Sequence, residues 1–216
     1  ADYWRYAARK NCAALRDDPW LFGWFLDNEL AWWGRGSHES GLFDAVMQFD
    51  IRHSAKQALT DYLKKRAGGD IDRFNRFWGT DCAGFDAAGK LTRLDGSTPE
   101  RIAVKHDFLK VIAERYFKLT TEAIRRVDPN HMIMGARFAG TGGADPAVWE
   151  IAGRYSDVIS FNCYPKADLD RGVVYSGFAT DAEPVREHFE RFYGYVNKPL
   201  LITEWSFPAL DAGLPS

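Results

Sequence analysis

The sequence predicts an α/β fold in which apolar strands alternate with amphipathic helices along 216 residues. Four short apolar runs have the composition of strands that are buried on both faces. Helical patterns separate these runs, and strands that alternate with helices favour a parallel sheet. A closed (β/α)8 barrel needs eight strands and typically about 250 residues. We therefore expect roughly half of a barrel, and we expect the chain to be a fragment of a larger protein or to pair with another partner.

Composition narrows the classes of function. The chain is 46% hydrophobic and 15% aromatic, which is ample for one packed core, and we expect residues 1–216 to form part of a single domain. Its 28 basic and 30 acidic residues give a net charge of -2, which lacks the basic surplus of a nucleic-acid-binding protein. No apolar run approaches the ~20 residues of a membrane span, and the first residues lack the pattern of a signal peptide. Cys12, Cys82 and Cys163 are expected to be buried thiols, with one disulfide as the alternative.

The expected elements alternate along the chain. In order, they are helix 3–16, strand 21–26, helix 53–66, a helix capped by Asp70, a long helix beginning near Pro99, strand 131–138, a helix from Asp145 to about Arg154, strand 158–164, a helix opened by Asp181 and strand 199–204. Apolar spacing places Phe74, Phe77 and Trp78 on the inward face of the Asp70 helix. Loops are expected at residues 30–50, at 79–96 and after Pro165.

Two of the expected strands end in glutamate. The run 21–26 breaks abruptly into Asp27-Asn28-Glu29, and the last strand ends at Glu204, followed by Trp205. In parallel α/β barrels the carboxyl ends of the strands carry the chemistry. These glutamates therefore predict a carboxylate pair that the fold brings together, which is the catalytic equipment of a retaining glycoside hydrolase when the carboxyls lie about 5–5.5 Å apart.

The pattern Asn28-Glu29, Tyr164 and Glu204, each at the end of a strand, resembles glycoside hydrolase clan A. Residues 25–29 and 74–80 resemble the beta-galactosidase families of that clan, such as family 42. Residues 128–139 and 204–215 resemble more closely the agarase family, glycoside hydrolase family 50.

This resemblance implies a (β/α)8 barrel of which the chain supplies about strands four to seven. It also implies double displacement on β-linked, galactose-containing poly- or oligosaccharides without a cofactor. A secreted or periplasmic location follows from the agarase resemblance. We expect a carbohydrate as the partner, with no nucleic acid and no membrane.

The resemblance assigns a role to each main residue. Glu29 would be the general acid/base and Glu204 the nucleophile. Asn28 would bond the sugar 2-hydroxyl, and Tyr164 would donate its hydroxyl to Glu204. For each residue a purely structural role is the alternative: helix capping or an arginine pair for Glu29, a strand end for Glu204, a turn for Asn28 and rim packing for Tyr164.

Further candidates surround this set. Asn162 has the strand parity of Tyr164 and is expected to point the same way. Arg137 ends its strand and is expected to contact a substrate hydroxyl or Glu204, with a salt bridge to Asp27 or Asp145 as the alternative. Aromatic residues in the expected rim loops are candidate sugar platforms or packing residues: Trp32, Trp33, Trp205 and Phe207.

Two competing functions stay open at this point. A carbohydrate-binding protein could keep the barrel without catalysis. A metal-dependent barrel hydrolase would need clustered histidines, but the five histidines show no ligand spacing, so no metal site is expected. The glycine-rich residues 140–143 lack the Lys-Ser/Thr of a phosphate-binding loop and are interpreted as a rim loop.

Overall fold

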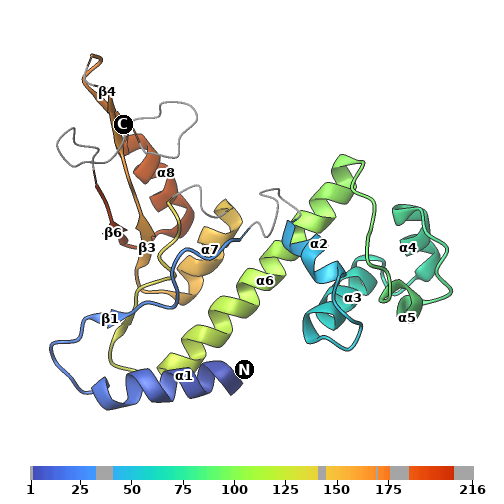
Figure 1. Ribbon diagram of the computed structural model, residues 1–216, viewed down its shortest axis with the longest axis horizontal. Coiled ribbons are helices and arrows are strands. Elements are labelled where there is room, and N and C mark those ends of the chain that lie inside the picture. The colour runs from blue at the N-terminus through green and yellow to red at the C-terminus, as the bar shows by residue number, and fades with distance from the viewer. Residues whose placement is uncertain (1, 33–40, 141–144, 169, 176–184, 207–216) are drawn as a thin grey trace, which may run out of the picture. The chain divides into compact units, whose positions relative to one another are not determined.

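The computed structural model describes residues 2–32, 41–140, 145–168, 170–175 and 185–206 (Figure 1). The chain divides into two compact units. The first, which we call the strand unit, consists of Ala1–Leu30 and Ala113–Ser216; the second, the helical unit, is Ala31–Ile112. None of the helices in the described part of the chain combines the length and apolar composition that a membrane span requires.

The strand unit has parallel strands, as predicted. Its strands are β1 (Gly23–Trp24), β2 (Met132–Ile133), β3 (Ile159–Asn162), β4 (Lys166–Asp168), β5 (Val173–Tyr175) and β6 (Leu200–Glu204). β1 pairs in parallel with β2, and β3 pairs in parallel with β6. A parallel bridge between Phe138 and Phe161 links the two pairs. The amide of Leu26 also donates to the carbonyl of Gly135 at 2.9 Å, so the pairing of β1 and β2 continues beyond the strands. The four expected strand segments therefore lie side by side in chain order.

A buried tryptophan of α7 is central to the packing of helices on these strands. The helices of the strand unit are α1 (Asp2–Cys12) with the 3-10 turn η1 (Ala13–Leu15), the second half of α6 (Pro99–Arg125), α7 (Pro146–Tyr155) and α8 (Val185–Val196). Trp149 of α7 is fully buried. Its ring lies 4.7 Å from those of Phe138 and Phe192 and 5.6 Å from that of Phe161, measured between centroids. Trp149 thus joins α7 to two strand segments and to α8.

The helical unit contains α2 (Gly41–Met47), α3 (Ser54–Arg66), α4 (Ile71–Trp78), α5 (Phe85–Ala88) and the first half of α6. The predicted cap of α4 is confirmed, because the Asp70 carboxylate accepts from the amides of Asp72 and Arg73 at 2.8 and 3.1 Å. Gly79 ends α4 at φ 69°, a left-handed conformation that glycine adopts without strain. The core of this unit is aromatic and includes Phe43, Phe74, Trp78 and Phe108.

Three segments expected to be loops contain regular structure. Helix α2 lies within residues 30–50 and α5 within residues 79–96, and both are too short to show a clear helical period in the sequence. The segment after Pro165 forms an antiparallel β4–β5 hairpin, with Gly172 at φ 62° in its turn. The start predicted at Asp181 for the last helix lies outside the described residues.

All three cysteines are free, as predicted, but only Cys12 and Cys163 are buried, whereas Cys82 is half-buried. The inward position predicted for Phe77 is wrong, because its side chain is 36% exposed. Phe74 and Trp78 form the buried face of α4, and Phe77 lies at the edge of that face.

Candidate active site

Two strand ends hold residues in an uncommon backbone conformation. Glu29, five residues beyond β1, has φ 51°, and Arg137, four residues beyond β2, has φ 45°. The amide of Glu29 donates to the carbonyl of Arg137 at 3.0 Å, so these residues lie beside each other. Non-glycine residues with positive φ are uncommon, and such strained positions cluster at functional sites.

The carboxylate of Glu204, at the end of β6, is held at both oxygens. The Tyr164 hydroxyl donates to Oε2 at 2.6 Å. The guanidinium of Arg137 forms an ion pair with Oε1. The predicted contact from Tyr164 to Glu204 is therefore confirmed, and of the alternatives considered for Arg137, the pairing with Glu204 is the one that the structure contains.

The pKa of Tyr164 is affected by both Glu204 and Glu29. Its hydrogen bond to Glu204 raises its pKa, partial burial adds to this effect, and the negative charges of Glu204 and then Glu29 raise the pKa further. The nearby Arg137 opposes the shift. Tyr164 therefore stays protonated at neutral pH and keeps its role as a donor, under the influence of both carboxylates.

Glu29 is held by Asn162, a fully buried residue at the end of β3. The Asn162 Nδ2 donates to Glu29 Oε1 at 2.7 Å, and the Thr203 hydroxyl donates to Asn162 Oδ1 at 2.8 Å. A register shift between Phe161 and Asn162 places Asn162 opposite Glu204. Bulges of this kind re-aim side chains next to active sites.

These contacts place the two glutamates at one end of the parallel strands. One chain of contacts runs from Glu29 through Asn162 to Thr203, which directly precedes Glu204. A second runs from Glu204 to Arg137, whose carbonyl accepts the amide of Glu29. The arrangement can hold two carboxylates beside each other with fixed orientations.

The other predicted residues have different surroundings, and their roles in binding sugar stay predictions. Asn28 is exposed, and its backbone amide donates to Asp27 Oδ1 at 3.0 Å. Trp205, directly after Glu204, is 68% exposed. Trp32 is only 4% exposed and belongs to the helical unit. Trp33 and Phe207 lie outside the described residues.

Three residues that the sequence analysis did not select complete the surroundings. Ser160 Oγ accepts from the amide of Arg137 at 3.0 Å, and the Arg137 guanidinium lies 5.6 Å from the centroid of the Phe25 ring. Ser160 shares the two-residue alternation of Asn162 and Tyr164, a signal that could have identified it. Thr203 has the opposite parity to Glu204, so alternation alone points away from it.

Thr203→Val is expected to lower turnover about tenfold with little loss of stability. Valine has nearly the same shape but cannot donate to Asn162 Oδ1. The side-chain amide of Asn162, which donates to Glu29, therefore loses one of its fixed contacts. One such hydrogen bond contributes roughly 0.5–1.5 kcal/mol. Steady-state kinetics measures the effect, and Thr203→Ser, which keeps the hydroxyl, should restore turnover. Equal losses in the two variants would show that the hydrogen bond from the Thr203 hydroxyl to Asn162 is not what maintains turnover.

Comparison with solved structures shows which known structures this chain resembles. The chain matches the crystal structure of an agarase, AgWH50C, with a TM-score of 0.78 and 24% identity over 98% of this chain and 28% of that one. It matches the structure of an exo-beta-agarase with a TM-score of 0.75 and 25% identity, over 97% of this chain and 26% of that one. A beta-galactosidase from the psychrophilic Marinomonas ef1 matches at a TM-score of 0.62 and 18% identity, over 94% and 31%. The structural neighbours are thus glycoside hydrolases.

Sequence comparison points to one group among them. The chain is 29% identical over 206 residues to beta-agarase B of Vibrio sp. (strain JT0107), covering 92% of this chain and 19% of that protein. It is 29% identical over 208 residues to beta-agarase A of the same strain, covering 91% and 19%. No protein-family model matches the chain. The chain is therefore similar to beta-agarases, and it spans about a fifth of the length of these curated relatives.

Proposed function

We propose that this chain forms the part of a retaining glycoside hydrolase that carries both catalytic glutamates. In this proposal the four parallel strand segments are strands four to seven of a (β/α)8 barrel, and the chain is part of one catalytic domain. The single observation that supports it most is the hydrogen-bonded network that holds Glu29 and Glu204 at the same end of parallel strands.

In the first step Glu204 attacks the anomeric carbon, and the bond from that carbon to the glycosidic oxygen breaks. Glu29 gives its proton to the leaving oxygen. Glu204 must be ionised to attack, and the ion pair with Arg137 together with the Tyr164 hydrogen bond orients its carboxylate. The exposed Asn28 is adjacent to Glu29, in a position from which it would bond the sugar 2-hydroxyl.

In the second step water hydrolyses the glycosyl ester of Glu204. Glu29, now ionised, takes a proton from the water, whose oxygen attacks the same anomeric carbon and releases Glu204. The configuration of the sugar is retained because two displacements occur. The hydrogen bond from Asn162 fits this step, since it fixes the orientation of the Glu29 carboxylate.

The similarity to beta-agarases supports a galactose-containing poly- or oligosaccharide with β-glycosidic bonds as the substrate. The same similarity favours a secreted or periplasmic protein. No step of the proposed mechanism needs a cofactor, because the two carboxylates supply the proton transfer and the nucleophile. Exposed Trp205 is the candidate ring on which the sugar would stack.

The proposal is tested with Glu29→Gln and two substrates that differ in their leaving group. An oligosaccharide releases a basic alkoxide that needs a proton, so its hydrolysis should fall by ~10²–10⁴-fold. A dinitrophenyl galactoside releases a stable anion, so formation of the glycosyl-enzyme should stay near the wild-type rate. Stopped-flow release of dinitrophenol measures this step in the complete protein. Wild-type hydrolysis of the oligosaccharide, or an equal loss on both substrates, would refute the role of Glu29.

A further inference from the structure

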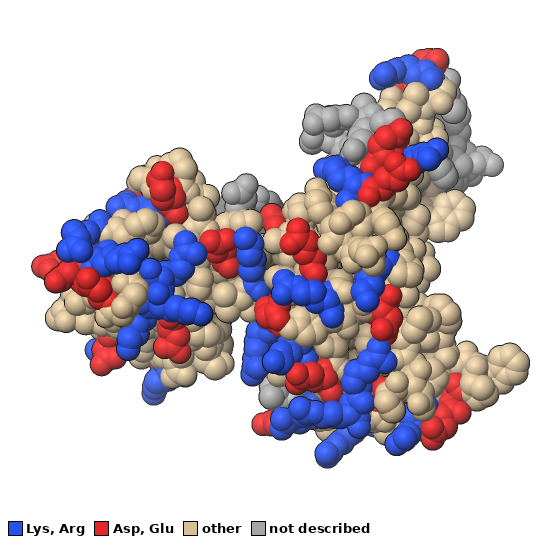
Figure 2. Space-filling model, turned by 180° about the vertical axis from the view of Figure 1, so that it is seen from behind, with Lys and Arg blue, Asp and Glu red and all other residues tan. Residues whose placement is uncertain are grey.

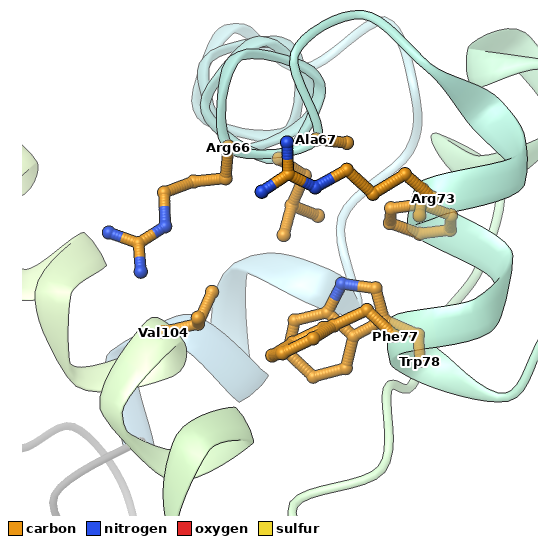
Figure 3. Close-up of a pocket in the computed structure, with 8 residues that line it drawn as sticks. Arg66, Ala67, Arg73, Phe77, Trp78 and Val104 are labelled. Atoms are coloured by element: carbon orange, nitrogen blue, oxygen red, sulfur yellow. The ribbon is translucent and has the colours of Figure 1, made fainter.

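A second concave site lies within the helical unit. It is a cavity of ≈ 180 Å³ between α3, α4 and α6 (Figure 3). Its lining includes Leu63, Arg66, Arg73, Phe77, Trp78 and Val104. Ligand sites for drug-sized molecules span roughly 300–1,000 Å³, so this cavity suits a single small unit. All of its lining residues belong to the helical unit, whereas Glu29 and Glu204 belong to the strand unit.

One wall of the cavity is aromatic and held in place. Trp78 is 4% exposed, and its ring stacks on Phe43 at 6.3 Å and meets the edge of Phe77 at 4.9 Å. The carbonyl of Phe77 accepts from Arg101 Nε at 2.7 Å, which fixes the last turn of α4. Phe77 is the exposed ring of this pair. The wall therefore offers a flat apolar surface whose orientation is set before any ligand arrives.

Two guanidinium groups flank the aromatic wall. Figure 3 shows the Arg73 side chain extending from α4 toward Ala67, the residue that follows α3, above the rings of Phe77 and Trp78. Arg66 is paired with Asp107 at 3.1 Å. Among the described residues the Arg73 guanidinium has no carboxylate partner, since the Asp70 carboxylate accepts the backbone amide of Arg73 at 3.1 Å and not its side chain. Figure 2 shows further Lys and Arg side chains gathered over the face of the helical unit that is in view.

We propose that this cavity binds one anionic sugar unit, a sulfated or carboxylated pyranose, at a position separate from the catalytic carboxylates. The apolar C–H face of the sugar would lie on Phe77, and its anionic group would accept charge-assisted hydrogen bonds from Arg73. The choice of a sugar as the ligand rests on the proposed function. The choice of an anionic one rests on the unpaired charge of Arg73. Such a site would hold a charged galactan chain on the protein while another part of that chain is cleaved.

The test measures binding by calorimetry in the complete protein, with Glu204→Gln present so that the ligand is not hydrolysed. The probes are a short sulfated galactan oligosaccharide and the same oligosaccharide without sulfate. Arg73→Ala should weaken binding of the sulfated probe at least about tenfold and leave the unsulfated probe unchanged. Phe77→Ala should weaken binding of both. Arg76→Ala removes an exposed arginine of the same helix that does not line the cavity, and it should change neither.

Each outcome decides for or against the site. Equal effects of Arg73→Ala and Arg76→Ala would show that the sulfated probe is attracted by the positive charge of the surface in general, and this would overturn the proposal. No binding of the sulfated probe would also overturn it and would indicate that the cavity serves packing. Thermal unfolding shows whether each variant is folded. Hydrolysis of a neutral galactan by the protein with Glu204 intact tests the proposed function separately: Arg73-dependent binding without any hydrolysis would leave the site standing and refute only the enzyme.

Discussion

Glu204→Gln is expected to reduce turnover of a galactose-containing oligosaccharide about 10⁴-fold or more and to leave the fold intact. The amide has the shape of the carboxylate and can still accept the hydrogen bond from Tyr164, but it cannot attack the anomeric carbon as an anion. It also loses the ion pair with Arg137. Removal of a covalent nucleophile from other enzymes costs as much as ~10⁶ in kcat. The measurement is kcat in the complete protein, with thermal unfolding as the check on the fold.

A matched control is Glu150→Gln, which changes an exposed glutamate on α7 in the same unit. This variant should retain wild-type kcat. If Glu204→Gln also turned over the substrate at the wild-type rate, Glu204 would not be the nucleophile. If both variants lost turnover to the same degree, the loss would report a general effect of charge on the protein.

Asp128→Ala is expected to lower the free energy of unfolding by roughly 3–5 kcal/mol, the cost of removing one partner of a buried charged pair. The Asp128 carboxylate is fully buried. Its Oδ2 accepts from Trp24 Nε1 on β1 and contacts His131 Nδ1, each at 2.7 Å, and its Oδ1 accepts from the amides of Asn130 and His131 at 3.0 and 3.2 Å. These donors would lose their partner. Because Trp24 and His131 flank the paired strands β1 and β2, the loss would loosen the strand unit.

The pairing of Asp128 with His131 makes stability depend on pH. Burial alone would raise the pKa of Asp128, but hydrogen bonds from Trp24, His131 and Asn130 outweigh it and lower the pKa. This contribution is present above the unfolded pKa of about 3.9 and is lost as pH falls. A hydrogen bond to the Asp18 carbonyl, and then one to Asp128, raises the pKa of His131. That contribution is complete below about 6.5 and is lost as pH rises through the folded pKa.

Stability from this pair should therefore be greatest between pH ~4 and ~6.5. Urea unfolding of wild type and Asp128→Ala at several pH values measures both effects. Asp170→Ala, which changes an exposed aspartate of the same unit, should stay within about 0.5 kcal/mol of wild type. A loss no larger than that of Asp170→Ala would contradict the account of this network.

The sequence identified the strands from their apolar runs. It identified helix starts because Asp70 and Asp145 are N-cap residues and Pro99 is favoured at the first helical position. The extent of the strands could not be predicted. Regular pairing defines β1 and β2 for only two residues each, although single backbone hydrogen bonds from Leu26 to Gly135 and from Glu29 to Arg137 continue it. No local pattern specifies the positive φ of Glu29 and Arg137.

The site was predicted in part, for a similar reason. Strand ends that carry Glu29, Tyr164 and Glu204 are visible in the sequence, and parallel pairing is enough to bring them to one edge. Alternation placed Asn162 on the same side as Tyr164, but it did not identify Glu29 as the partner of Asn162, because that contact joins segments far apart in the sequence. Thr203 is adjacent to Glu204 along β6, so alternation predicts that it points to the opposite side, yet its hydroxyl donates to Asn162.

The most direct test of the central claim is to treat the complete protein with a 2-deoxy-2-fluoro galactoside that carries a good leaving group, and to analyse its peptides by mass spectrometry. The fluorine slows both steps but leaves the first one faster, so the glycosyl-enzyme accumulates. We expect one fluoro-sugar attached to the side chain of Glu204. Hydrolysis of a galactan by a protein that takes no label, or that takes it on another residue, would refute the role of Glu204 as the nucleophile.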